Sequence, residues 1–176
     1  SVNRNGRRVT VVINGLNSKK KRRYESKRLM ENTINTLEAI SPVDGRYASK
    51  TSELRAFTSE HALIYYRVVV EVNWFKFLAS QVGIPDLPEL DGQSNELLNK
   101  LIQSFSTKES EEIKEFEAKT NHDVKAVEYF LKSCFLKSKN RALIDASEFI
   151  HFACTSEDIN NLAYALMLRD ARDQII

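Results

Sequence analysis

Three short polar stretches carry most of the residues that could do chemistry in this chain. They are residues 41–47 (SPVDGRY), 120–124 (TNHDV) and 154–161 (CTSEDINN). Each lies where a loop is expected to lead into a helix. Together they offer a guanidinium, an imidazole, hydroxyls and the backbone amides of helix starts, all of which bind anions. The combination predicts a pocket for a phosphorylated small molecule that also carries carboxylates.

The first stretch has the composition of a tight turn. An Asp side chain bonds to nearby backbone, and Gly accepts a positive φ, so Asp44 and Gly45 favour a turn. This turn would present Arg46, whose guanidinium can hold a phosphate through two hydrogen bonds, and Tyr47, whose hydroxyl can add another. A surface turn with a solvated arginine has the same pattern, so this stretch alone does not decide between the two.

The second stretch falls between two predicted helices. Asp123 can cap the second helix, which would leave Asn121 and His122 exposed at its positive end. Histidine titrates near neutral pH and can exchange a proton or pair with a carboxylate. A single histidine at a cap is nevertheless more often structural, so this interpretation also depends on the other stretches.

The third stretch has hydroxyls at an expected helix start and acids in the first turn. Thr155 and Ser156, followed by Glu157 and Asp158, form the pattern of a capping box. Capping is a sufficient explanation, but the same hydroxyls and amides could hold a carboxylate or a phosphate. The other two histidines, at positions 61 and 151, lie among apolar neighbours and are interpreted as partly packed and non-catalytic.

The elements that must position these groups are helices. From residue 48 onward every long segment has helical periodicity, and no alternating strand pattern appears outside the first residues. The body of the chain is therefore predicted to be all-α. The expected helices run from a Ser59 cap to about residue 81, from Ser94, from Ser106 or Thr107, from Asp123 to about residue 137, around 143–152, and from Thr155 or Ser156 to the end.

Two of these helices carry specific expectations about burial. In the helix after Ser59, Arg67 is expected to bury only its aliphatic stem. In the helix from Asp123, the periodicity turns Tyr129 inward together with its apolar neighbours.

Composition excludes several classes of protein. With 42% apolar and 28% charged residues the chain is typical of a globular protein, and no apolar run approaches the roughly 18 residues of a membrane helix. The two cysteines, Cys134 and Cys154, do not make a disulfide framework and are expected to be buried free thiols in a reducing compartment. Their spacing is a poor zinc pattern. We therefore expect no metal site, no membrane partner and a cytoplasmic location.

Charge divides the chain into two parts. Residues 1–29 hold ten Lys and Arg against one acid, whereas the remaining 147 residues hold 16 Lys and Arg against 23 Asp and Glu. A basic leader, residues 1–35, is therefore expected to be disordered or non-native to the domain. Its run Lys19–Arg23 could also bind nucleic acid or act as a nuclear address, and the shortage of acids is compatible with organellar import.

In order and spacing, the three polar stretches closely resemble the motifs of the adenylosuccinate lyases, a family of the fumarase/aspartase superfamily. The resemblance rests on residues 37–47, 120–131 and 149–161, covers about residues 36–176, and is greatest to the bacterial and plant type. It implies an N-terminal all-α lyase domain over 36–154. It also implies that residues 155–176 are the truncated start of the first helix of the central helical bundle, so that the chain is an N-terminal fragment.

The resemblance also implies roles for the site residues. Arg46 and Tyr47 would bind the phosphate of a nucleotide substrate. Asn121, His122 and Asp123 would line the substrate pocket, with His122 orienting the substrate or bonding to it.

On the third stretch, the resemblance implies that Thr155 and Ser156 hold the carboxylates of the succinyl group. The implied reaction is β-elimination of fumarate from adenylosuccinate, giving AMP, and from the succinylated carboxamide ribotide of purine biosynthesis. No metal or organic cofactor is implied. The family's general acid histidine and its catalytic serine would lie beyond residue 176, so no residue of this chain is assigned a catalytic role and the isolated chain is expected to be inactive. The family's full-length enzymes are homotetramers.

Two alternatives stay open at this point. The chain could belong to another lyase of the superfamily, such as an argininosuccinate or aspartate lyase, although the Asp-Gly-Arg-Tyr and Asn-His-Asp stretches weigh against that. It could also be a helical module that binds nucleic acid through the basic leader. The acidic body, which offers no basic helical face, makes a nucleic-acid partner the weaker hypothesis.

Overall fold

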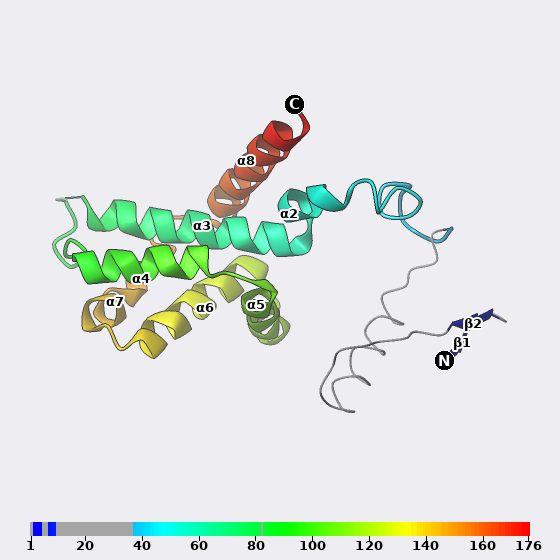
Figure 1. Cartoon of the computed structure of the whole chain (residues 1–176). Coiled ribbons are helices and arrows are strands. Elements are labelled where there is room, and N and C mark those ends of the chain that lie inside the picture. Colours follow the sequence, from blue (N-terminus) through cyan, green and yellow to red (C-terminus); the bar gives the residue numbers. More distant parts are fainter. Residues whose placement is uncertain (1, 5–6, 10–36, 82) are drawn as a thin grey trace. The chain divides into compact units, whose positions relative to one another are not determined.

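The computed structural model of the 176-residue chain describes residues 2–4, 7–9, 37–81 and 83–176. It separates into two compact units, Ser1–Glu53 and Leu54–Ile176 (Figure 1). The predictions made for the basic leader fall mostly on residues outside those described.

The first unit is small. Strands β1 (Val2–Arg4) and β2 (Arg7–Val9) pair antiparallel, with Val2 opposite Val9. Residues 37–51 form successive turns, and a 3-10 helix, η1 (Ser52–Leu54), follows them.

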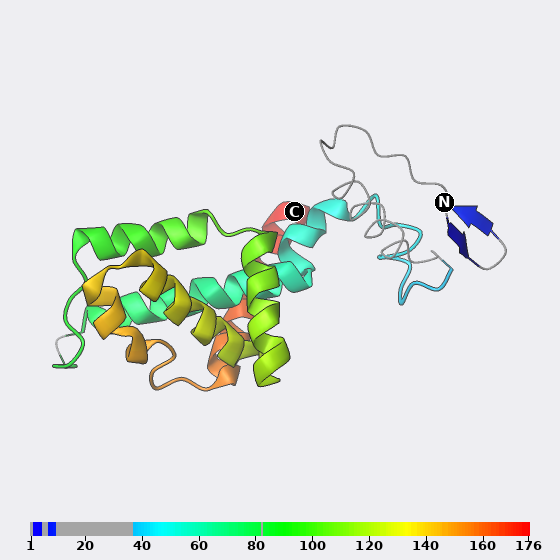
Figure 2. The same cartoon turned by 90° about the horizontal axis from the view of Figure 1, so that it is seen from below.

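Among the described residues of the second unit, the regular secondary structure is entirely helical (Figures 1 and 2). This confirms the all-α prediction for the body of the chain. The helices are α2 (Arg55–Thr58), α3 (Glu60–Ala79), α4 (Gly92–Gln103), α5 (Thr107–Thr120), α6 (Asp123–Ser138), α7 (Arg141–Asp145), η2 (Ser147–Phe149) and α8 (Ser156–Ile175). The helix expected around residues 143–152 is thus two short elements, α7 and η2.

Side-chain caps define most of the helix starts. Ser59 accepts a hydrogen bond from the Ala62 amide and starts α3, as predicted. Ser106 starts α5 in a capping box with Glu109. The prediction that Ser94 opens α4 is wrong: Asp91 is the cap, and its Oδ1 accepts from the Ser94 amide at 2.7 Å. The carboxylate three residues earlier therefore starts the helix, and Ser94 lies buried in its first turn.

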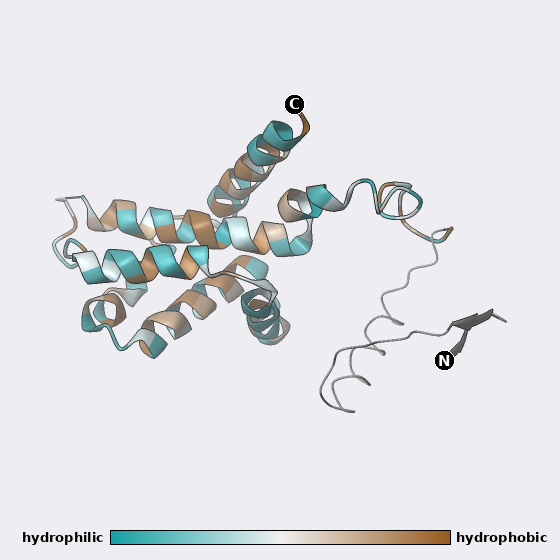
Figure 3. Cartoon of the chain, viewed as in Figure 1, coloured by the Kyte–Doolittle hydropathy of each residue, from teal (hydrophilic) through white to brown (hydrophobic). Residues whose placement is uncertain are grey.

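Helix α3 lies at the centre of this unit and packs against α4, α5, α6 and α8. A larger apolar cluster that includes Val68, Phe75 and Phe130 joins α3 to α4, α5, α6 and α7. A smaller one that includes Tyr66, Ile159 and Met167 joins α3 to α6 and α8. Buried apolar residues consequently occur on more than one face of α3. Figure 3 shows hydrophobic and hydrophilic residues alternating along this helix.

Several burial predictions need correction. Tyr129 is 39% exposed because its ring lies at the surface of α6 against Phe116, rather than in the core. Arg67 is buried along its whole length, not only at its stem, since its guanidinium has partners on two other helices. Both cysteines are free, as expected, but only half-buried. Among the described residues, no helix is long and apolar enough to cross a membrane.

Candidate functional site

The start of α6 is built from the second polar stretch. Asn121 ends α5 in the left-handed conformation, with φ 51°, which Asn tolerates better than most residues. His122, rather than the expected Asp123, is the cap: its Nδ1 accepts from the Lys125 amide at 3.2 Å. A ring nitrogen that accepts carries no proton, so this contact puts the proton of a neutral His122 on Nε2. The half-exposed ring can thus donate outward from Nε2.

The start of α8 is built from the third stretch. Thr155 and Asp158 form the predicted capping box, in which Asp158 Oδ2 accepts from the Thr155 amide at 2.7 Å and from the Thr155 hydroxyl at 2.9 Å. These hydrogen bonds lower the pKa of Asp158. Within the described part of the chain, the Ser156 hydroxyl has no hydrogen-bond partner. Of the two hydroxyls, therefore, that of Ser156 is the one available to a ligand.

Arg67 joins these two helix starts. From α3, its guanidinium donates to Asp123 Oδ2 at 2.6 Å and through Nε to Asn160 Oδ1 at 2.9 Å. Asp123 is the first residue of α6, and Asn160 lies in the second turn of α8. One buried side chain thus brings the second and third polar stretches together, which no periodicity in the sequence could have indicated.

Asp123 is an ionised partner in this arrangement. Partial burial acts to raise its pKa, but the hydrogen bond from the Val124 amide and the positive charge of Arg67 outweigh burial and lower it. Its side chain is 45% exposed, whereas that of Arg67 is 5% exposed. The carboxylate therefore serves first to neutralise a buried cation, and keeps part of its surface for solvent or a ligand.

A second buried ionisable group lies one turn along α3. Glu71 is fully buried, and its Oε1 lies 2.6 Å from Nδ1 of His151, in the loop that precedes α8. Burial raises the pKa of Glu71, and the contact with His151 lowers it by less. His151 was interpreted from the sequence as partly packed, and the structure agrees; its link to a buried carboxylate was not foreseen.

Arg46 and Tyr47 lie in the first unit. Asp44 Oδ1 accepts from the amide and the hydroxyl of Ser41, at 2.9 and 3.1 Å, which closes the turn that the Asp-Gly pair predicted and lowers the pKa of Asp44. The Arg46 guanidinium lies over the Tyr47 ring, 4.6 Å from its centroid. Both side chains are exposed. A stacked guanidinium keeps its in-plane N–H donors available for a phosphate.

Other features of the second unit do not coincide with these residues. A cavity of about 490 Å³ between α3 and α5 is lined by His61, Ser110 and Lys114, among others, and contains none of the predicted site residues. In the described part of the chain, no group of three or more His, Cys, Asp or Glu side chains could hold a metal ion.

Comparison with known proteins identifies the family. A family model described as Lyase matches residues 45–176. The chain belongs to this lyase family. The adenylosuccinate lyase of Legionella pneumophila (strain Corby) is 55% identical over 144 residues, which are 82% of this chain and 31% of that protein. The adenylosuccinate lyase of Haemophilus influenzae is 52% identical over 144 residues, and that of Escherichia coli (strain K12) is 50% identical over 143 residues. Each of these alignments covers 81% of this chain and 31% of the relative.

The match to this lyase family confirms the resemblance found in the sequence. It corresponds to the N-terminal portion of adenylosuccinate lyase. The chain spans about a third of the length of the curated relatives that it matches. The seven predicted substrate contacts remain predictions.

Sequence reasoning overlooked the groups that hold the helix starts in place. Arg67 and Glu71 are spaced four residues apart on α3 and so share one face of that helix. They occur within a run rich in Val, Ile and Tyr, and two charges in such a run were the available signal. Their partners, Asn160 and His151, lie within the stretches that resemble the family, but had no assigned role.

Proposed function

We propose that this chain supplies substrate-binding groups of an adenylosuccinate lyase. The proposed reaction removes fumarate from adenylosuccinate to leave AMP, and likewise from the succinylated carboxamide ribotide of purine biosynthesis. A base takes the proton from the carbon β to the nitrogen, the carbon–nitrogen bond breaks, and the departing nitrogen receives a proton. No metal or organic cofactor takes part in this proposal.

The observation that best supports the proposal is the arrangement around Arg67. Two helix N-termini, each a favourable place for negative charge, are linked through Asp123 and Asn160 to one guanidinium. A substrate with carboxylates and a phosphate needs more than one such place. The identity of 50–55% to adenylosuccinate lyases over about four-fifths of the chain adds the substrate class.

Each stretch has a proposed role. Arg46 and Tyr47 bind the phosphate, with the stacked guanidinium donating in its plane. His122 contributes its outward Nε2–H to the substrate. Thr155 and Ser156 bind the succinyl carboxylates at the start of α8, where backbone amides add to the free hydroxyl of Ser156 and to a Thr155 hydroxyl that is shared with Asp158.

The two remaining predicted contacts act closer to the backbone. Asn121 holds the turn between α5 and α6 and lines the pocket beside His122, and Asp123 lines it while paired with Arg67.

The proton-transferring acid and base are proposed to lie outside this sequence, so that the isolated chain binds but does not turn over substrate. In the complete enzyme the site is proposed to form in a homotetramer, in the cytoplasm. The division into a leader of 1–35, a lyase domain of 36–154 and a bundle helix from 155 belongs to the same proposal.

A chimera tests the proposal directly. Residues 36–176 would replace the corresponding segment of the Escherichia coli adenylosuccinate lyase, and fumarate release from adenylosuccinate would be measured. We expect activity in the chimera and none in the 176-residue chain alone. A folded, tetrameric chimera without activity would contradict the proposal.

Within this chimera, Arg46→Met should raise the KM for adenylosuccinate at least tenfold, because a phosphate contact is lost. The matched control is Arg141→Met, which removes another exposed arginine, whose partner is Asp145 on the same helix. The control should keep its KM within twofold of the unsubstituted chimera.

A further inference from the structure

The loop of residues 150–155, between η2 and α8, has an unusual backbone. His151 and Ala153 both have positive φ, 63° and 59°. Residues with a β-carbon seldom adopt this region, because the β-carbon then approaches the following carbonyl oxygen. Two such residues within three positions persist only where neighbouring groups hold them, and segments of this kind are frequent at functional sites.

Two side chains of α3 hold this loop. Glu71 contacts the His151 ring at 2.6 Å, and the Trp74 indole N–H donates to the Phe152 carbonyl oxygen at 2.8 Å. Glu71 and Trp74 are three residues apart and therefore lie on neighbouring turns of one helix face. Both contacts fall just before Thr155, the cap of α8.

Stability alone is a poor explanation for Glu71. Its side chain is fully buried, and its Oε2 has no hydrogen-bond partner within the described structure. The titratable groups that face it are His151 and Cys154, in the loop before α8, and the buried Glu128 on α6, whose negative charge repels it. Burying a charge with an unpartnered oxygen costs free energy, and an apolar side chain of similar volume often costs none. Glu71 must therefore have another role.

We propose that Glu71 and Trp74 are positioning residues that fix the strained loop and so aim Thr155 and the first turn of α8 at the ligand. The proposal rests on the proposed function, since it assigns the ligand to the start of α8. The same α3 face also holds Asn160 through Arg67, so the loop and the helix that follows it are held from one element.

Glu71→Met and Glu71→Gln separate positioning from stability in the 176-residue chain. Met fills the space but cannot bond to His151, whereas the Gln carbonyl can still accept from Nδ1–H. Trp74→Phe removes the indole N–H donor and keeps an aromatic ring at that position. Ser110→Ala is the control: it removes a buried polar group on α5 whose hydrogen-bond partner is His61, near the start of α3.

Three measurements decide the outcome: amide hydrogen exchange of residues 151–158, the urea midpoint, and adenylosuccinate binding by calorimetry. Glu71→Met should unfold at the same urea concentration as wild type or a higher one, yet exchange at least tenfold faster at these amides and bind adenylosuccinate at least tenfold more weakly. Trp74→Phe should accelerate the same amides. Glu71→Gln and the Ser110→Ala control should stay within threefold of wild type in exchange and affinity.

Unchanged exchange at residues 151–158 in both Glu71→Met and Trp74→Phe would overturn the proposal. An exchange rate in Glu71→Gln as fast as that in Glu71→Met would also overturn it. A wild-type chain that does not bind adenylosuccinate would count against the proposed nucleotide-binding role instead, and the exchange rates would still decide the positioning role.

Discussion

Substituting a buried residue usually costs more stability than substituting an exposed one. For the ion pair between Arg67 and Asp123 we predict the opposite order. Arg67→Met removes the buried partner, and Asp123→Asn removes the half-exposed one. We expect Asp123→Asn to destabilise the chain more. Arg67→Met leaves behind a carboxylate that water can reach, whereas Asp123→Asn leaves behind a buried guanidinium that water cannot reach.

The magnitudes follow from exposure and distance. Opposite charges with centres about 4 Å apart attract by about 4 kcal/mol at an effective dielectric constant of 20. Solvent around the 45% exposed Asp123 reduces this value, so we expect Asp123→Asn to cost about 3 kcal/mol. Arg67→Met loses the bonds to Asp123 and Asn160 but buries a thioether in place of a charge, so its cost should be about 1 kcal/mol.

The assay is urea unfolding of wild type, both single variants and the double variant, followed by circular dichroism at neutral pH. Once Arg67 is Met, Asp123 is an ordinary surface carboxylate, and the double variant should be about as stable as Arg67→Met alone. Two results would refute the reasoning: a larger loss for Arg67→Met than for Asp123→Asn, or additive losses in the double variant.

Three further predictions concern stability and reactivity. Ala153→Gly should stabilise the chain by about 0.5–1 kcal/mol in urea unfolding, because glycine adopts a φ of 59° without strain, and a loss of stability would contradict this. Burial raises the pKa of Glu71, so above pH about 4.5 the folded state still holds a proton that the unfolded state has released. The contribution of this group to the free energy of unfolding therefore falls as the pH rises above about 4.5. The stability of Glu71→Gln relative to wild type should therefore increase from pH 4.5 to pH 8, and an unchanged difference would refute the shift. Burial raises the pKa of the Cys134 thiol to about 11, so iodoacetamide should alkylate it at pH 8 at least tenfold more slowly than an unfolded control, and equal rates would contradict this.

The helices and their starts followed from local signals. Ser59, Ser106 and Thr155 each precede an amphipathic run, and a hydroxyl that bonds an amide two or three residues later needs no tertiary structure. The error at α4 has the same origin, because Asp91 and Ser94 are both good caps and the sequence offered no means of ranking them.

Groups whose role depends on packing could not be predicted in this way. Periodicity treats a charge within an apolar run as an interruption, so Arg67 was assigned a solvent-facing head and Glu71 no role at all. Arg67 is buried because Asp123 on α6 and Asn160 on α8 accept its hydrogen bonds, and Glu71 contacts His151 of the loop before α8. All three partners lie more than 50 residues further along the chain. Tyr129 failed for the converse reason: it fits the periodicity of α6, but the contact of its ring with Phe116 on α5 leaves it 39% exposed.

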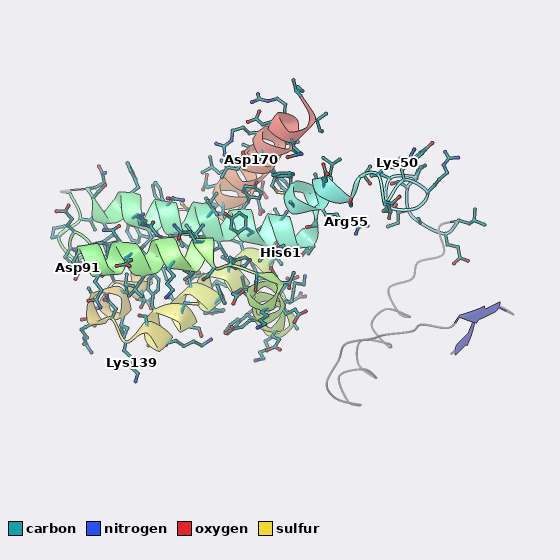
Figure 4. The ribbon with its side chains drawn as sticks, in the orientation of Figure 1. Lys50, Arg55, His61, Asp91, Lys139 and Asp170 are labelled. Atoms are coloured by element: carbon teal, nitrogen blue, oxygen red, sulfur yellow. The ribbon has the colours of Figure 1, made fainter. Side chains whose placement is uncertain are left out.

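The contacts of α8 on both sides of its start bear on how a carboxylate would bind there. Tyr66 on α3 donates to Asp170 on α8 at 2.7 Å, so the far part of the helix is held to α3 as well (Figure 4, where Asp170 is labelled). With the helix fixed, Asp158 already occupies the place of an anion, since its carboxylate accepts from both the amide and the hydroxyl of Thr155. Under the proposed function, a carboxylate that bonds to Thr155 must displace or share these bonds, whereas the Ser156 hydroxyl has no hydrogen-bond partner within the described residues. Ser156 is therefore the stronger candidate for direct contact, and Thr155 acts chiefly by fixing where the helix begins.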